Sequence, residues 1–134
     1  MIKSLNHIGI AVRDLEASVE LFKKIFQTQN IHREVVEEQK VSIASFKVGD
    51  VILELTAPTS PESPIAKFIE KRGEGIHHLA FKSDNVATDL ERLKGENIQL
   101  INEKPQPGAH DMLIAFMHPK STGGVLMELC QDKI

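Results

Sequence analysis

Two histidines and two glutamates recur at matching places in the two halves of the sequence: His7 and His78, then Glu54 and Glu128. Imidazole nitrogens and carboxylate oxygens together suit a divalent ion such as Zn²⁺, Co²⁺, Mn²⁺, Ni²⁺ or Fe²⁺. A carboxylate in the middle of an apolar strand also needs a cation, a partner or water, because burying it bare is very unfavourable. The repeated set therefore predicts one divalent metal site built from these four side chains.

Short apolar segments position the histidines. Residues 6–14 and 77–84 each place a histidine among apolar residues and end near an aspartate, which is typical of a strand. Neighbouring side chains on a strand point to opposite faces, so His77 is expected to face away from His78 and to play a supporting or structural role. We also expect His32 and His118 not to be ligands.

A helix is predicted after each of these strands. Apolar residues recur at spacings of three and four over residues 15–26 and 86–93, which indicates one apolar face per helix. Asp14 and Asp84 are expected to begin the two helices, and Gly95 is expected to end the second.

Each half closes on an apolar segment that carries one central glutamate. These segments span residues 49–55 and 123–129, each begins at a glycine turn, and strand-like residues 41–46 and 112–117 precede them. Because each glutamate alternates with apolar neighbours, it is expected to face away from them. The order β-α-β-β-β is thus predicted twice, over about residues 4–57 and 75–131.

Two turn-rich segments complete the chain. The connector over about residues 58–74 is expected to hold a short helix from Ile65 to about Arg72, with Pro64 in its first turn and Gly73 as its end. The Pro- and Gly-containing residues 103–111 are either a lid over a ligand or a plain surface loop.

Composition narrows the class of protein. The formal net charge of −3 argues against a nucleic-acid-binding protein, which usually carries a basic excess. No apolar run approaches the roughly 20 residues of a membrane span. The single cysteine cannot form an internal disulfide, which fits a reducing compartment. We therefore expect a cytoplasmic protein with no membrane or nucleic-acid partner.

The His-strand openings and Glu-strand closings resemble the vicinal oxygen chelate superfamily. Within it, residues 63–69, 73–81 and 118–129 are similar to the methylmalonyl-CoA epimerases. The resemblance implies an α+β fold, in which two tandem β-α-β-β-β modules form an open mixed-sheet barrel around one metal site. It also implies a single domain over residues 1–134, a homodimer and an acyl-CoA substrate.

The resemblance further implies the ligands and the reaction. His7, His78 and Glu128 match the family's metal ligands, and Glu54 matches a fourth position that is glutamine in some epimerases. One divalent ion per chain is expected, with Co²⁺ as the first choice and Mn²⁺, Ni²⁺, Zn²⁺ or Fe²⁺ as alternatives. The implied reaction interconverts (R)- and (S)-methylmalonyl-CoA by removing and returning the α-proton through a metal-stabilised enolate.

The catalytic base cannot be carried over from the family. Some epimerases use a glutamate in the second strand, and that position falls at or near Ile43 here. We therefore expect Glu54 and Glu128 to act as the acid–base pair, with Glu37 or Glu38 as the alternative base.

Other assignments stay open. The candidate contacts for the CoA phosphates are Lys120, the loop with Gly108 and His110, and the pair Lys71–Arg72.

The alternative functions are glyoxalase I (lactoylglutathione lyase), which has the same four ligands, and a non-catalytic small-ligand-binding or resistance protein. Glyoxalase I generally carries an Asp-Pro-Asp-Gly turn before its last strand, whereas this chain has His118-Pro119-Lys120.

Overall fold

The computed structural model describes residues 1–133. The chain divides into two compact units, of which unit 1 joins Met1–His7 to the chain from His78 onward and unit 2 is Ile8–His77. The strands are hydrogen-bonded in the order β2-β3-β4-β1-β5-β8-β7-β6. Two strands cross the division, β1 (Ile2–Ala11) between His7 and Ile8, and β5 (Gly75–Ser83) between His77 and His78.

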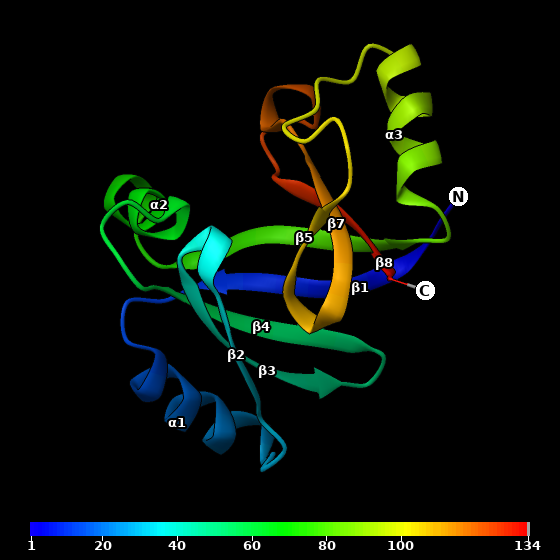
Figure 1. Cartoon of the computed structure of the whole chain (residues 1–134). Helices are drawn as coiled ribbons and strands as arrows, with labels where there is room; N and C mark the ends of the chain where they lie inside the picture. The colour runs from blue at the N-terminus through cyan, green and yellow to red at the C-terminus, as the bar shows by residue number, and fades with distance from the viewer. Residues whose placement is uncertain (134) are drawn as a thin grey trace. The chain divides into compact units, whose positions relative to one another are not determined.

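Unit 2 contains an antiparallel three-stranded arrangement and two helices. Strand β3 pairs with β2 on one side and with β4 on the other (Figure 1). Gly49, with φ of +62°, forms the tight turn between β3 and β4. The elements are α1 (Leu15–Phe26), β2 (His32–Val36), the 3-10 turn η1 (Glu37–Gln39), β3 (Val41–Val48), β4 (Val51–Pro58) and α2 (Pro64–Arg72).

Helix α1 covers one face of this arrangement. Its buried Val19 packs with Leu15 and Phe22 against Leu55 of β4 and Ala44 of β3. The face of β4 that carries Leu55 is therefore a packing surface, and the alternate residues of β4 face away from α1.

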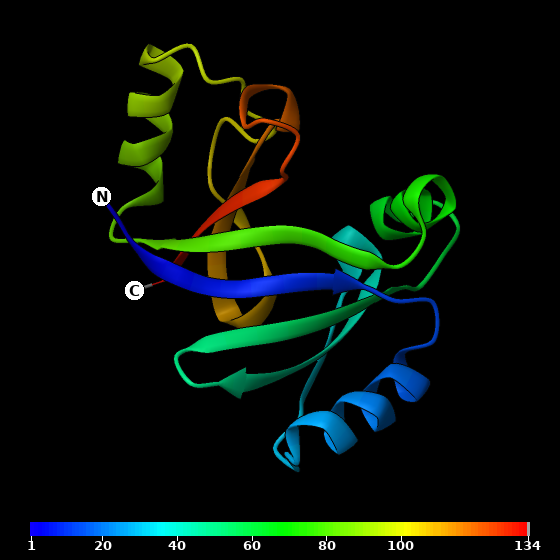
Figure 2. The same ribbon diagram turned by 180° about the vertical axis from the view of Figure 1, so that it is seen from behind.

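Unit 1 repeats the same plan with a shorter second strand. Figure 2 shows β5 leading directly into α3. Strand β8 pairs in parallel with β5 and antiparallel with β7, and β6 pairs antiparallel with β7. The elements are α3 (Val86–Gly95), β6 (Gln106–Pro107), the 3-10 turn η2 (Ala109–Asp111), β7 (Met112–Met117), the 3-10 turn η3 (Pro119–Ser121) and β8 (Met127–Asp132).

Helix α3 covers one face of unit 1. Val86 and Leu90 pack against Ala115 and Met117 of β7 and against Leu129 of β8. A second buried cluster lies on the other face of these strands and consists of Ala80, Met112, Ile114 and Cys130, with Phe116 packed against it.

The predicted fold class is confirmed by the element order β-α-β-β-β in both halves and by one mixed sheet. The predicted helices over residues 15–26 and from residue 65 to about residue 72 are confirmed, and the second begins one residue earlier, at Pro64. Their N-caps are Asp14 and Ser63. The candidate lid, residues 103–111, contains β6, which pairs antiparallel with β7.

The single domain over residues 1–134 stays a prediction. No helix of the described residues is long and apolar enough to cross a membrane.

Two predicted boundaries are wrong. Helix α3 is capped by Asn85 rather than Asp84, because the Asn85 side chain accepts a hydrogen bond from the Thr88 N–H at 3.0 Å. Asp84 is exposed and instead accepts a hydrogen bond from the Met1 ammonium at 2.5 Å, with Lys3 Nζ at 3.7 Å. Strand β8 begins at Met127, later than the sequence pattern indicates, because Gly123 and Gly124 both adopt positive φ and extend the turn.

Candidate functional site

Strand alternation places His78 on the face of β5 that looks away from α3. Phe81 packs into the core beneath α3, whereas Ala80 belongs to the cluster on the opposite face. His78, two residues before Ala80, shares its face. The His78 side chain is only 6% exposed, and the edge of its ring lies against Phe116 with the centroids 5.6 Å apart.

The same alternation fixes Glu128 on β8. Leu129 is fully buried beneath α3, so Glu128 points to the other face. Its neighbours across the strands are Ala80 of β5 and Phe116 of β7. A carboxylate that is only 4% exposed beside such apolar neighbours requires a positive or hydrogen-bonding partner.

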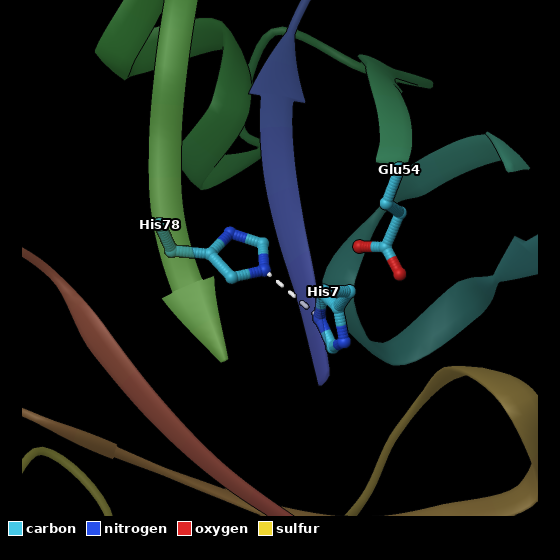
Figure 3. Close-up of side chains that lie close together, drawn as sticks. All are labelled: His7, Glu54 and His78. Carbon is cyan, nitrogen blue, oxygen red and sulfur yellow. Dashed lines mark hydrogen bonds between the residues drawn. The ribbon is translucent and has the colours of Figure 1, made fainter. Parts of the chain in front are cut away.

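His7, His78 and Glu128 bring three donor atoms together within unit 1. A hydrogen bond joins Nε2 of His78 to Nε2 of His7 at 3.3 Å, and Figure 3 shows the two imidazoles turned toward each other. Glu128 Oε1 lies 3.3 Å from His78 Nε2 and 3.7 Å from His7 Nε2. Three of the four predicted ligands are therefore adjacent.

The triangle of donor atoms fits a divalent metal ion. Ligand atoms bound to a tetrahedral ion at 2.0–2.2 Å are separated from one another by about 3.4 Å. The three observed separations, 3.3, 3.3 and 3.7 Å, are close to this value. Two imidazoles and one carboxylate form a mixed nitrogen and oxygen set, which suits a borderline divalent ion. The described residues of unit 1 thus contain a candidate metal centre.

Glu54, the fourth predicted ligand, belongs to unit 2. It lies on β4 next to Leu55, which packs beneath α1, so Glu54 faces away from the helix just as Glu128 does. Its side chain is 4% exposed, and its cross-strand neighbour on β3 is Ser45. The side chain of Glu54 is drawn with the two histidines in Figure 3. Its role as a ligand stays a prediction.

The alternative bases differ from Glu54 in exposure. Ile43 is buried on β3 and pairs with Thr56, so it shares the face of Glu54 and places an alkyl group there. Glu37 and Glu38 lie in η1 and are exposed. Of the candidate bases in unit 2, Glu54 alone is buried on the face of the sheet opposite α1.

The remaining histidines have partners of other kinds, and that they are not metal ligands stays a prediction. The His77 ring packs edge-on against Phe68 with centroids 4.9 Å apart. Burial lowers the pKa of His77 to about 4, against the opposing effect of the Glu54 charge, so His77 is neutral at neutral pH. His32 lies 3.0 Å from Glu34, and His118 accepts a hydrogen bond from the Lys120 N–H.

Cys130, whose only predicted property was that it forms no internal disulfide, lies close to this candidate centre. Cys130 is fully buried, and its thiol donates to the Phe81 carbonyl at 3.5 Å. With His7 and Glu128 it forms a second group of potential ligands whose donor atoms lie within 4.8 Å of one another. Its spacing of two residues from Glu128 on a strand was the available signal.

The candidate CoA contacts lie on turns. Lys120 is exposed in η3, and His110 is half-buried in η2 with a positive φ of 58°. Gly108 is required for close packing, because a Cβ atom there would meet Cγ2 of Ile114 at 2.7 Å. Lys71 and Arg72 are exposed at the end of α2. Their contact with a substrate stays a prediction.

The chain is similar to known proteins over nearly all of its length. A family model described as the glyoxalase/bleomycin resistance protein/dioxygenase superfamily matches residues 6–116. The mitochondrial methylmalonyl-CoA epimerase of Homo sapiens is 38% identical over 128 residues, which cover 95% of this chain and 73% of the human protein.

Solved structures give the same result. A variant of the Streptomyces coelicolor methylmalonyl-CoA epimerase in complex with 2-nitronate-propionyl-CoA is 34% identical, with a TM-score of 0.95 over 99% of this chain and 96% of that chain. A methylmalonyl-CoA epimerase in complex with methylmalonyl-CoA and NH4⁺ is 34% identical, with a TM-score of 0.94 over the same shares.

Proposed function

The chain belongs to the glyoxalase/bleomycin resistance protein/dioxygenase superfamily, and on this premise we propose that it is a metal-dependent methylmalonyl-CoA epimerase. The observation that carries the proposal is the convergence of His7 Nε2, His78 Nε2 and Glu128 Oε1 at 3.3–3.7 Å. These atoms supply the set of ligands that the reaction requires, and near-full-length similarity to epimerases supports the choice of substrate.

His7, His78 and Glu128 would hold one divalent ion. Glu54 is the proposed fourth ligand, because it matches Glu128 in the sequence repeat. Co²⁺ is the first choice, with Mn²⁺, Ni²⁺, Zn²⁺ or Fe²⁺ as alternatives. When bound, such an ion stabilises the negative charge that develops on the thioester oxygen as the α-proton leaves. The apolar neighbours Ala80 and Phe116 limit access of water to the carboxylate of Glu128.

Epimerisation requires a proton to leave one face of the α-carbon and another to arrive on the opposite face. We assign these transfers to the carboxylate oxygens of Glu54 and Glu128, which the repeat places at equivalent positions in the two modules. Both carboxylates are buried, on the faces of their strands that point away from the helices. Glu37 and Glu38 are the alternative, but their exposure makes them less suited to this role.

The experiment measures solvent exchange of the α-proton. The purified protein is stripped with a chelator, reloaded with Co²⁺ or Mn²⁺, and mixed with methylmalonyl-CoA in deuterated water. We expect metal-dependent deuterium incorporation with interconversion of the epimers, and none with the stripped protein or with His78→Ala. Efficient conversion of the hemithioacetal of methylglyoxal and glutathione to lactoylglutathione would identify a glyoxalase I instead. Binding of methylmalonyl-CoA without turnover would identify a non-catalytic binding protein.

The proposal includes the assembly and location expected from the sequence. We propose a homodimer that acts in the cytoplasm on a small acyl-CoA substrate. Light scattering coupled to size-exclusion chromatography should give a mass close to twice the 14.9 kDa of one chain. A monomeric mass in the active, metal-loaded protein would remove the homodimer from the proposal.

A further inference from the structure

Asn6, the residue before His7, contacts the imidazole directly. The Asn6 Oδ1 atom lies 2.7 Å from Nδ1 of His7. Consecutive side chains on a strand normally point to opposite faces, so contact between these two groups is not a default of β geometry. Asn6 is half-buried and His7 is 4% exposed, so solvent competes weakly for this bond.

The chemistry of the two atoms fixes the position of a proton. A carboxamide oxygen only accepts hydrogen bonds, so the Nδ1–H of His7 must be the donor. In the neutral imidazole the other nitrogen, Nε2, then carries the lone pair. That nitrogen is the atom 3.3 Å from His78 Nε2 and 3.7 Å from Glu128 Oε1.

The two histidines of the repeat are held by different means. His78 is packed edge-on against the Phe116 ring, and its Nε2 atom is hydrogen-bonded to Nε2 of His7. His7 is held by a hydrogen bond, which sets both the ring orientation and the tautomer. Metal-bound histidines are commonly oriented by such a bond from the nitrogen that does not bind the metal.

We infer that Asn6 is a positioning residue that holds His7 in the tautomer whose Nε2 lone pair faces His78 and Glu128. The inference rests on the proposed metal-dependent function, because the orientation and tautomer of His7 affect how tightly the site binds a metal. Asn6 acts through His7 and not on the substrate. An isosteric side chain without an acceptor, as in Asn6→Leu, removes this constraint, whereas Asn6→Asp retains an acceptor oxygen at the same place.

The first measurement needs no metal. Two-bond ¹H–¹⁵N spectra of the stripped protein, recorded well above the ordinary histidine pKa, report which imidazole nitrogen carries the proton. We expect the Nδ1–H tautomer of His7 in the unaltered protein and in Asn6→Asp, and a mixture in Asn6→Leu. Observation of the Nε2–H tautomer in the unaltered protein would overturn the inference whether or not Asn6→Leu folds.

The second measurement is Co²⁺ affinity by calorimetry. Loss of a hydrogen bond to a metal-bound histidine typically lowers affinity about 10–100-fold, which we expect for Asn6→Leu, with recovery to within a few-fold in Asn6→Asp. Asn30→Ala, at an exposed asparagine in unit 2, is the control and should bind as the unaltered protein does. Equal affinity of Asn6→Leu and the unaltered protein would contradict the role of Asn6. An unaltered protein that binds no Co²⁺ would instead refute the metal-dependent function, and the tautomer spectra would still test Asn6.

Discussion

Glu54 on β4 and Glu128 on β8 occupy equivalent positions in the two modules, yet their neighbours differ in chemistry. Across the strand from Glu54 is the hydroxyl-bearing Ser45, whereas Glu128 faces the Phe116 ring on one side and Ala80 on the other. Glu128 also has imidazole partners in its own unit at 3.3 and 3.7 Å. The side chains directly across the strands from the two glutamates therefore differ despite the repeat.

The helix-covered faces of the same strands are much more alike. Leu55 of β4 is almost fully buried beneath α1, and Leu129 of β8 is fully buried beneath α3. Each of these faces must exclude water against an amphipathic helix, so both modules place aliphatic side chains there. The two modules therefore carry similar side chains on the faces that pack against helices, and different side chains on the faces that carry the two carboxylates.

The largest expected effect concerns the carboxylates themselves. Glu54→Gln and Glu128→Gln each keep an oxygen but cannot take a proton, so each should lower epimerisation by about 10²–10⁴-fold with metal retained. If the two residues serve opposite faces of the α-carbon, each variant should still exchange the α-proton of one epimer with deuterated water, and the epimer should differ between them. Nearly full activity in metal-loaded Glu54→Gln would contradict the assignment of Glu54 and Glu128 as the two acid–base groups. Glu37 and Glu38 would then be the next residues to substitute.

A second test separates the two neighbouring histidines of β5. His78→Ala removes a donor atom of the triangle. Loss of a residue that only supports a ligand lowers metal affinity by up to about 100-fold, so Co²⁺ affinity should fall by more than that in His78→Ala. His77→Ala removes a ring that packs on Phe68, and its affinity for Co²⁺ should change much less. Calorimetric titration of both variants gives the comparison. Equal losses would mean that the two faces of β5 have been assigned the wrong way round.

The helix-covered faces should respond alike. Leu55→Ala and Leu129→Ala each leave a cavity in a packed cluster and should lower the free energy of unfolding by about 2–5 kcal/mol. Urea denaturation followed by circular dichroism measures both. Leu21→Ala, at a side chain that is 53% exposed on α1, is the matched control and should change stability little. A large difference between the two core variants would show that the modules are not equivalent even where they are packed by helices.

The smallest expected effects are at the helix caps. Asp14→Ala and Asn85→Ala each remove a side chain that accepts an N–H of the first turn, and each should cost about 1 kcal/mol of stability. Asp84→Ala should cost less, because its partners, the Met1 ammonium and Lys3, are exposed and such ion pairs contribute little. The same denaturation experiment ranks the three. A larger loss for Asp84→Ala than for Asn85→Ala would restore Asp84 as the cap.

Much of the fold could be predicted because it depends on local patterns. The predicted family is confirmed, as are the two helices after the histidine strands and the helix of the connector. The errors lie at boundaries. Asp84 and Asn85 are adjacent and both are good caps, so the choice between them depended on which side chain reached the Thr88 N–H. The late start of β8 depended on a turn made by two consecutive glycines.

The sequence by itself determined which residues could do chemistry and which face of each strand they occupy, because strand alternation and helix periodicity are local properties. Only the tertiary structure decided which donor atoms meet. The distances among His7, His78 and Glu128 depend on pairing between strands far apart in the chain, such as the parallel register of β5 and β8. The same pairing brings Cys130 near His7 and Glu128. The Asn6–His7 hydrogen bond depends on side-chain rotamers that spacing along a sequence does not specify.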